Sequence, residues 1–421
     1  MGFLLACLSV VLFADGCHHD SSQKPVRLSQ RGYLWQRDWT PAVADAMREA
    51  GKHLDGVVVL GAEVLWNGKT PQAIKATISW PELKASPEPC ALALRIAPYP
   101  GPFSEDDEQV RAIAGVAKSL LDEARNNGVT LSEFQIDFDC AQDKLDGYRA
   151  WLRTLAKVAH PTRLVITTLP AWLDEPGFPA LVKETDGYIL QVHSVPTRAE
   201  SGRTALCDPI LARKWVTKAS DLGMPFSVAL PTYWCLAGYD PGGKLFGVAM
   251  DSVQPSWPPG TRTLEFGTNA DELAALVREW DISRPPGMQG LLWYRLPVVT
   301  DLRNWRWPTL LAVMAGRGPS HRMKVIREGD APVDFTLVNS GEADEPLNCD
   351  MVVRWSDSKL LTLDALPGWT VSPDEGKAVF TTNPDYRLRL LPGEKVGIGW
   401  IRFEKEPVLQ TEIVPHHENS P

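Results

Sequence analysis

Short apolar runs alternate with helical segments from residue 31 to about residue 316, and this alternation constrains the fold more than any other feature. Eight such runs occur, and several are nearly continuous apolar stretches, as in parallel strands that helices cover on their outer side. The runs are 32–36, 56–63, 90–98, 134–140, 163–169, 187–194, 226–233 and 290–296. Eight strand–helix units over 31–316 predict a (β/α)8 TIM barrel, a fold of typically about 250 residues.

The intervening segments have helical patterns with recognisable ends. Asn269 and Glu272 form a capping box at the start of one of them. The predicted helices are 41–54, 104–127, 144–159, 207–222 and 269–280, and 301–315 closes the ring. A doubly wound open sheet is the main alternative, but it usually has fewer strands and a glycine-rich phosphate loop. No GxGxxG or GxxxxGK[ST] motif follows any of the eight runs, which favours the barrel.

The chain changes character after the barrel. Residues 320–411 alternate polar and apolar side chains at period two between turn signals, which predicts a small antiparallel β-sandwich domain. Residues 412–421 are polar and predict a flexible tail. Such a sandwich can bind glycans or brace the barrel, and bracing is the favoured interpretation.

The N-terminus indicates export. Residues 1–17 contain an apolar run that is too short to span a bilayer and resembles a secretory signal peptide. Ala14-Asp15-Gly16-Cys17 looks like a bacterial lipoprotein box, which implies a lipid on Cys17 and a linker over 18–30. The protein is therefore expected in the bacterial envelope, anchored to the membrane through that lipid and facing the periplasm or the cell surface.

Charge and cysteine content limit the partners. A net charge of −9 argues against a nucleic-acid partner, because phosphate binding needs an excess of Lys and Arg. Sixteen Trp residues suit contact with sugar rings, although Trp is also ordinary core material. Of the five cysteines beyond Cys17, Cys207 and Cys235 are candidates for a disulfide. No clustered Cys or His spacing indicates zinc, and we expect neither a metal nor a cofactor.

Asp137 and Asp139 are the strongest candidates for chemistry. They lie two apart on the fourth predicted strand and therefore share one face, opposite Phe134, Ile136 and Phe138. Two carboxylates on one face repel each other and resist desolvation, so stability rarely explains them. Acid/base chemistry on a sugar or phosphate requires such a pair, whereas the plainer interpretation is a solvated loop edge or a structural ion pair.

Other candidates follow the remaining strands, because working residues in barrel enzymes lie at the carboxyl ends of strands. Together they predict a mouth suited to a polyhydroxylated ring, with aromatic faces for its CH side and polar groups for its hydroxyls. The long connection 236–267 is expected to cover this mouth as a lid, with Trp257 against the sugar. The candidates are Glu63 as a further acid, and Trp35, Arg37, Trp172, Gln191, His193, Tyr233, Trp234, Trp293 and Arg295 for binding.

Several of these motifs together resemble an uncharacterised bacterial family, DUF3142, for which no activity is established. The motifs are Leu34-Trp35-Gln36-Arg37, Gln135-Ile-Asp-Phe-Asp139, Thr167-Thr-Leu-Pro-Ala-Trp172, Gln191-Val-His193 and Ala229-Leu-Pro-Thr-Tyr-Trp234. More distantly, Ile136-Asp137-Phe138-Asp139 resembles the Asp-x-Asp-x-Glu motif of chitinase-like glycoside hydrolases, and Trp293 resembles the Trp that floors their sugar subsite.

The sequence departs from the chitinase-like motif at one position. That family's general acid is the Glu two residues after the second Asp, and here the position is Ala141. The resemblance implies only supporting roles for Asp137 and Asp139. Either Asp139, Asp137 or Glu63 has become the acid, or a strand-four Asp acts as nucleophile as in α-galactosidase-like barrels, or the protein binds a glycan without cleaving it.

The sequence thus predicts a glycoside hydrolase-like protein with Asp139, Asp137 and Glu63 as its catalytic carboxylates and an unidentified glycan as its substrate. The alternative is a non-catalytic carbohydrate-binding or envelope scaffold protein. A third possibility is a metal hydrolase, in which Asp137, Asp139 and His193 hold a hard cation.

Overall fold

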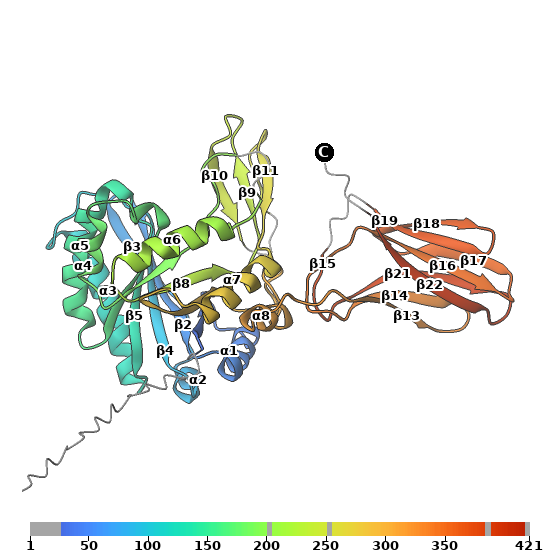
Figure 1. Ribbon diagram of the computed structural model, residues 1–421, viewed down its shortest axis with the longest axis horizontal. Coiled ribbons are helices and arrows are strands. Elements are labelled where there is room, and N and C mark those ends of the chain that lie inside the picture. The colour runs from blue at the N-terminus through green and yellow to red at the C-terminus, as the bar shows by residue number, and fades with distance from the viewer. Residues whose placement is uncertain (1–26, 200–203, 251–254, 384–388, 417–421) are drawn as a thin grey trace, which may run out of the picture.

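The computed structural model describes residues 27–199, 204–250, 255–383 and 389–416 of the chain (Figure 1). The expected signal peptide, Cys17 and most of the expected linker lie outside these ranges. No helix within them is long and apolar enough to cross a membrane.

Eight parallel strands form a closed barrel, which confirms the predicted fold class. β1 pairs with both β2 and β12, so the sheet has no open edge at this point: Gly32 lies opposite Val57 on one side and Trp293 on the other. The barrel strands are β1 (Ser29–Leu34), β2 (Val57–Asn67), β4 (Cys90–Ile96), β5 (Leu131–Phe138), β6 (Arg163–Thr168), β7 (Tyr188–Gln191), β8 (Phe226–Pro231) and β12 (Met288–Tyr294).

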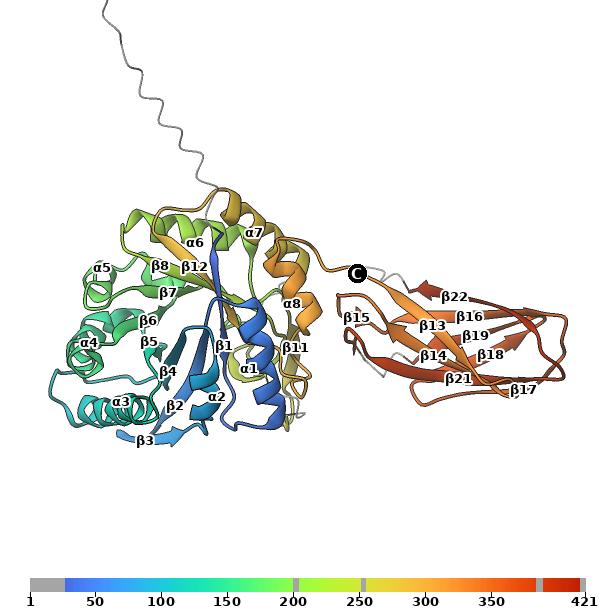
Figure 2. The ribbon, with the colours of Figure 1, turned by 90° about the horizontal axis from the view of Figure 1, so that it is seen from below.

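Helices follow the strands and surround the barrel (Figure 2). The predicted cap at Asn269 is present, since its side chain accepts hydrogen bonds from the backbone N–H groups of Asp271 and Glu272. The helices are α1 (Pro41–His53), α2 (Trp80–Ala85), α3 (Glu108–Asn126), α4 (Leu145–Ala159), α5 (Phe178–Val182), α6 (Pro209–Asp221), α7 (Ala270–Ile282) and α8 (Trp307–Met314), with 3-10 turns η1 (Gln142–Lys144) and η2 (Pro170–Trp172).

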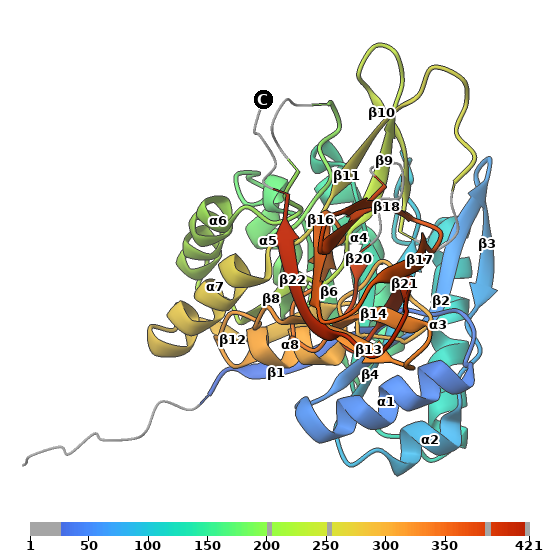
Figure 3. The ribbon, with the colours of Figure 1, turned by 90° about the vertical axis from the view of Figure 1, so that its right-hand side faces the viewer.

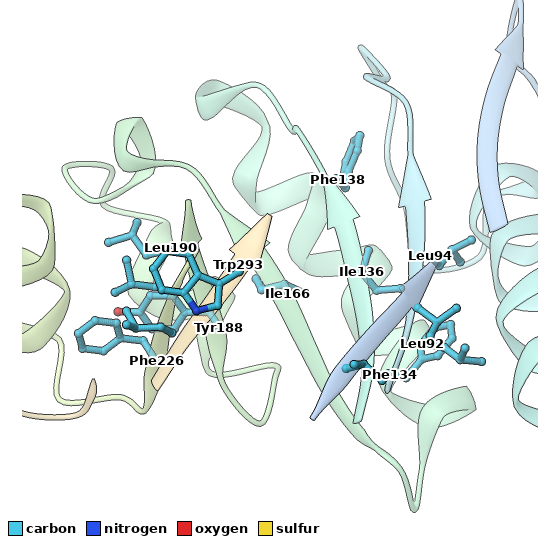
Figure 4. Close-up of a cluster of buried hydrophobic side chains, with 14 of the residues drawn as sticks. Leu92, Leu94, Phe134, Ile136, Phe138, Ile166, Tyr188, Leu190, Phe226 and Trp293 are labelled. Atoms are coloured by element: carbon cyan, nitrogen blue, oxygen red, sulfur yellow. The ribbon is translucent and has the colours of Figure 1, made fainter. Parts of the chain in front are cut away.

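Side-chain alternation along each strand divides the barrel into an outer and an inner layer. On β5, Phe134, Ile136 and Phe138 point outward and pack in the large core between strands and helices (Figure 4). Between them, Gln135 and Asp137 point into the barrel. The strand pattern thereby directs polar groups to the barrel axis and keeps the outer layer apolar.

Two antiparallel additions extend the barrel beyond its carboxyl end. β3 (Thr70–Lys75) folds back on the extended end of β2. A three-stranded hairpin sheet, β9 (Cys235–Tyr239), β10 (Leu245–Ala249) and β11 (Arg262–Phe266), rises from the barrel after β8 (Figure 1). The connection expected to be a lid is therefore an ordered sheet over much of its length.

The C-terminal region holds two four-stranded antiparallel sheets around their own apolar core (Figure 3). One is formed by β13 (Met323–Glu328), β14 (Val333–Asn339), β21 (Lys395–Phe403) and β17 (Leu360–Ala365), and the other by β18 (Trp369–Asp374), β19 (Lys377–Thr382), β16 (Cys349–Ser356) and β22 (Val408–Pro415); β15 (Glu345–Pro346) and β20 (Arg389–Leu390) form a short extra pair. The tail predicted from 412 begins later than expected, because β22 stays paired with β16 as far as Pro415.

Polar contacts join the barrel to the sandwich. Arg306 Nη2 lies 3.3 Å from Glu394 Oε1, and Thr309 Oγ1 donates to the Glu342 carbonyl at 2.5 Å. Further along the junction, Arg389 Nη2 lies 2.6 Å from Glu265 Oε1 of the hairpin sheet. These contacts connect two barrel segments, the start of α8 and β11, to the sandwich.

The five described cysteines are all free and buried. The disulfide considered between Cys207 and Cys235 is therefore absent. Burial raises the pKa of each of these two thiols to about 12, so both are neutral at pH 7.

Candidate active site

Asp137 is firmly held inside the carboxyl end of the barrel. Its Oδ1 accepts hydrogen bonds from Thr167 Oγ1 at 2.7 Å and from Gln191 Nε2 at 3.2 Å. Its Oδ2 lies 3.8 Å from Arg95 Nη1, and only 8% of the residue is exposed. Neighbouring strands β4, β6 and β7 supply these partners, so the carboxylate is positioned from three sides.

Asp139 lies one residue beyond the end of β5 and is bound by nothing comparable. Among the described residues, no hydrogen bond or ion pair forms to its carboxyl group, which still reaches solvent at the rim. Asp139 is exposed, yet the protein around its carboxyl group partly desolvates that group and the charge of Asp137 adds to this effect, so the pKa of Asp139 rises to about 6 despite the opposing charge of Arg95. A carboxyl group with such a pKa can give and take a proton near neutral pH.

Glu63 lies in the same wall but is already paired. It forms an ion pair with Arg37 and lies 3.9 Å from Arg95 Nε. Arg95 thus stands between Glu63 and Asp137. Burial alone would lower the pKa of Arg95, but the nearby Asp137, Tyr294, Asp139 and Glu63 raise it overall, so the guanidinium stays charged.

Tyr294 is the centre of the aromatic part of the mouth, and the sequence analysis overlooked it. Four rings contact it, with centroid distances of 5.4 to 5.8 Å. They belong to Tyr33, Trp35, His193 and Tyr233. The strand-end aromatics expected from β1 and β8 therefore do converge, around a residue from β12.

His193 is a neutral member of this group. Its Nδ1 lies 3.3 Å from the Ala229 carbonyl, which can only accept, so Nδ1 carries the hydrogen and Nε2 is an acceptor. Burial lowers the pKa of His193 to about 4. The imidazole stacks on Tyr294 at an interplanar angle of 22°. It is suited to accept a hydrogen bond from a ligand hydroxyl.

The assignment of Trp293 to the mouth was wrong. Trp293 is fully buried in the outer core, and Figure 4 shows it with Tyr188, Leu190 and Phe226. Its Nε1 donates to Gln30 Oε1 at 3.0 Å. The neighbouring Leu292 and Tyr294 take the inward positions on β12. The prediction therefore had the face of this strand reversed.

Arg295 and Trp172 also lie away from open solvent. Arg295 Nε donates to Asp301 Oδ2 at 2.7 Å, and its Nη2 donates to the Met250 carbonyl at 3.1 Å. These bonds use the guanidinium to tie the hairpin sheet to the barrel. Trp172 is buried and donates from Nε1 to the Cys140 carbonyl at 3.1 Å. Both residues brace the mouth from behind.

Trp234 and Trp257 belong to a different surface. Trp234 lines a cavity between the barrel and the sandwich, where the Arg389 guanidinium lies 5.4 Å from its ring centroid. Trp257 packs against Phe246 on the hairpin sheet. Of Tyr233, Trp234 and Trp257, which were expected to share one mouth, Tyr233 lies there and the two tryptophans do not.

Sequence reasoning missed Arg95, Tyr33 and Tyr294 as mouth residues. Arg95 has a detectable signal, because it ends a strand whose other inward residues are Ala91 and Ala93. Tyr294 could have been recognised as a mouth residue only if the inward face of β12 had been assigned correctly.

A hard-cation site built from Asp137, Asp139 and His193 is not formed. Across the part of the chain that the structure describes, no three His, Cys, Asp or Glu side chains are grouped so that they could hold a metal ion. His193 is instead bound to a backbone carbonyl and packed between tyrosines.

Solved structures with a similar fold include two chitinases and a spore enzyme. A chitinase from Bacillus thuringiensis is 9% identical with a TM-score of 0.44, covering 92% of this chain and 100% of its own. A chitinase from Chromobacterium violaceum is 13% identical with a TM-score of 0.47, covering 69% and 98%. The spore cortex-lytic enzyme SleL from Bacillus cereus is 12% identical with a TM-score of 0.47, covering 69% and 74%.

No curated protein matches the sequence. A family model matches the part of the chain that carries Asp137, Asp139 and four of the five motifs, whereas Glu63 and the Leu34–Arg37 motif lie outside the match. Residues 99–299 match the model described as "Domain of unknown function (DUF3142)", which confirms the family resemblance carried by the strand-end motifs.

Proposed function

We propose that this protein is a glycoside hydrolase in which Asp139 is the general acid and base. One observation carries the proposal: an unpaired carboxyl group with a pKa raised to about 6 lies beside a fully bound Asp137 at the carboxyl end of the barrel. The aromatic group around Tyr294 supports a sugar ring as the ligand.

The proposed reaction begins with proton transfer from Asp139 to the glycosidic oxygen, after which the bond from that oxygen to C1 breaks. Positive charge then develops on the ring, and the Asp137 carboxylate stabilises it. In the second half, the Asp139 carboxylate takes a proton from the water that attacks C1. The carboxyl group returns to its starting state, and the products are two shorter sugars.

The attacking group of the first step is proposed to come from the substrate. Asp137 is held by Thr167, Gln191 and Arg95, and Glu63 is held by two arginines, so neither is free to bond to C1. The carbonyl oxygen of a 2-acetamido group can bond to C1 instead as the glycosidic bond breaks, as in substrate-assisted glycosidases. When water attacks C1 in the second half, the bond between C1 and this oxygen breaks and the acetamido group is restored. We therefore propose glycans that contain 2-acetamido sugars as the substrate class.

The site of action is proposed to be the bacterial envelope, with a lipid on Cys17 as the membrane anchor. The apolar run followed by Ala14-Asp15-Gly16-Cys17 supports this proposal. Metabolic labelling with a palmitate analogue should mark the wild-type protein and leave Cys17→Ser unlabelled. Equal labelling of both proteins would contradict the anchor.

A non-catalytic glycan-binding protein is the second candidate, and Ala141 favours it. This position carries the general acid in the chitinase-like motif, and alanine cannot donate a proton. In this case Asp137, Asp139 and His193 would only bind hydroxyl groups.

The deciding experiment measures release of reducing ends from chitohexaose and from purified peptidoglycan. Asp139→Asn should lower the rate by about 10²–10⁴-fold, the usual contribution of a general acid. Asp143→Asn is the matched control, because Asp143 is an exposed acid of the same loop and, among the described residues, its carboxylate forms an ion pair with Lys144 alone. A wild-type rate in Asp139→Asn overturns the proposal, and saturable binding without turnover supports the second candidate.

A further inference from the structure

A cavity of about 570 Å³ lies between the barrel and the sandwich, on the far side of the hairpin sheet from the mouth. The barrel contributes Trp234 and Glu265 together with the first residues of α7, and the sandwich contributes His321, Asp344 and Arg389. Its size is within the range of about 300–1,000 Å³ that is typical of small-ligand sites.

The hairpin sheet separates this cavity from the mouth. On one face of β9, Cys235, Ala237 and Tyr239 pack in a cluster that contains Tyr233 and Tyr294 of the mouth. Leu236 and Gly238 alternate with them and point to the other face. Glu265 of β11 lies opposite Leu236 of β9, and its carboxylate forms an ion pair with Arg389 of the sandwich. The cavity therefore belongs to the second face.

The polar groups of the cavity are arranged for a neutral, hydroxyl-bearing ligand. Asp344 Oδ1 is buried and has no hydrogen-bond partner among the described residues. Burial raises the pKa of Asp344 to about 7, so this group can both donate and accept near neutral pH. Arg389 is fixed by Glu265 at 2.6 Å and by the ring of Trp234. Asp271 and Glu272 also line the cavity, and this acidic lining disfavours phosphates and other anions.

An aromatic surface lies on the same face of the hairpin sheet as the cavity. The indole of Trp257 lies over Gly238 and Gly247, where an added Cβ would come within 3.1 and 3.0 Å of it. Only glycine at both positions lets the ring lie this close to the strands. Phe246 meets the indole edge-on at 5.5 Å and is 47% exposed.

The spacing between the two features suits a chain of sugars. Gly238 is opposite Thr263, and Glu265 is two residues further along β11. Two residues of a strand correspond to about 7 Å, and residues two apart share a face. A ligand that fills the cavity can thus extend to the Trp257 surface, where an indole face suits the CH side of a sugar ring.

We propose that the junction cavity and the Trp257 surface form a second saccharide-binding site, which holds a glycan chain apart from the mouth. The inference goes beyond the proposed function, because binding at the junction requires no chemistry at Asp139. It assigns a role to the sandwich domain as well: Asp344, His321 and Arg389 complete a site that the barrel alone lacks.

The test is the number of chitohexaose molecules bound per chain, measured by isothermal titration calorimetry on the full chain with Asp139→Asn to prevent turnover. We expect two sites. Adding Trp257→Ala or Asp344→Ala should abolish binding at the junction and leave the mouth site. Adding Tyr294→Ala should abolish binding at the mouth and leave the junction site, and combining Trp257→Ala with Tyr294→Ala should abolish both. Leu361→Ala, on an exposed position of the sandwich, is the control and should keep two sites.

Loss of folding is checked by thermal unfolding, and Trp257→Phe provides a second variant that keeps an aromatic face and should retain both sites. The inference is overturned if Trp257→Ala and Asp344→Ala each leave the number of bound molecules unchanged. Binding of hexalysine in place of the saccharide at the junction also overturns it. Failure of hydrolysis with two bound molecules contradicts only the proposed function, and hydrolysis with one bound molecule contradicts only this inference.

Discussion

The Arg95 guanidinium lies 3.8 Å from the Asp137 carboxylate and gives this acid a cationic partner inside the barrel. Thr167 and Gln191 bind the same carboxylate, whereas Asp139 has no such partners among the described residues. Two acids of one strand thus have different environments, which is the usual basis for different roles in acid/base catalysis. The two acids therefore differ: Asp137 is held by its hydrogen-bond partners, and Asp139 is free to exchange a proton.

The rate of hydrolysis should fall as pH rises through about 6. The pKa of Asp139 is raised to about 6, so the protonated form needed for proton donation is lost above this value. The measurement is kcat/KM on chitohexaose between pH 4 and 9. A profile that stays flat from pH 5 to 8 would argue against Asp139 as the acid.

Arg95→Gln should move the same descending limb to higher pH. The charge of Arg95 lowers the pKa of Asp139, so its removal raises that pKa further. The variant should also lose about 1–3 kcal/mol of stability, because Asp137 and Glu63 lose a partly buried cationic partner. Arg37→Gln is the control: Arg37 is largely exposed and pairs only with Glu63. Equal pH profiles for both variants would contradict the prediction.

Trp293→Ala should destabilise the fold by about 3–5 kcal/mol, the usual cost of removing a large buried aromatic side chain. Urea unfolding measures this loss. Tyr294→Ala removes an inward ring instead and should raise KM for the glycan with a smaller loss of stability. A raised KM for Trp293→Ala with unchanged stability would restore Trp293 to the mouth.

Acid should destabilise the protein partly through His193. Its folded-state pKa is lowered to about 4, below the unfolded value of about 6.5. Its contribution to stability is therefore complete above pH 6.5 and is lost as pH falls towards 4, by at most about 3 kcal/mol. His193→Gln should flatten the dependence of the free energy of unfolding on pH across this interval. An unchanged slope would show that other groups cause the acid lability.

Ala141→Glu should increase hydrolysis if the chain is a weak hydrolase or an inactive relative of one. Ala141 is exposed two residues beyond Asp139, after a turn in which the Cys140 N–H donates to the Phe138 carbonyl at 2.8 Å. A carboxyl group at this position should raise the rate by about 10²-fold or more. Ala141→Gln has the same size without the acid and is the control. Equal rates in both variants would indicate that the position no longer faces the substrate.

The barrel could be predicted from the sequence because its signal is repeated eight times. Each strand run was recognised, and most predicted ends lie within three residues of the observed ones. The inward position of Asp137 was likewise readable, since it alternates with Phe134, Ile136 and Phe138 on β5, whereas Asp139 lies beyond the end of that strand. What lay beyond the strand ends was much less readable. The hairpin sheet was not predicted, and its segment was expected to be a lid. Its strand pairing depends on contacts between distant residues rather than on the local sequence pattern.

Errors in the site arose where one residue decides which face is used. On β12 the prediction chose Trp293 and the structure uses Tyr294; a shift of one position reverses every side chain of a strand. Trp234 follows Tyr233 directly, yet the two rings face different sides of the hairpin sheet. Arginine at position 95 was overlooked because a charged residue at the end of an apolar strand looked like an ordinary boundary.

The pairing of β1 with β12 also bears on how the chain reaches its native state. Ser29 of β1 lies opposite Gly290 of β12 in a parallel pair, so the barrel cannot close until its first and last strands have paired. Contacts between such distant parts of a chain slow folding and leave strand edges unprotected in the meantime. Until β12 is in place, β1 is therefore an unpaired edge of an open sheet, and aggregation during synthesis or refolding should begin there.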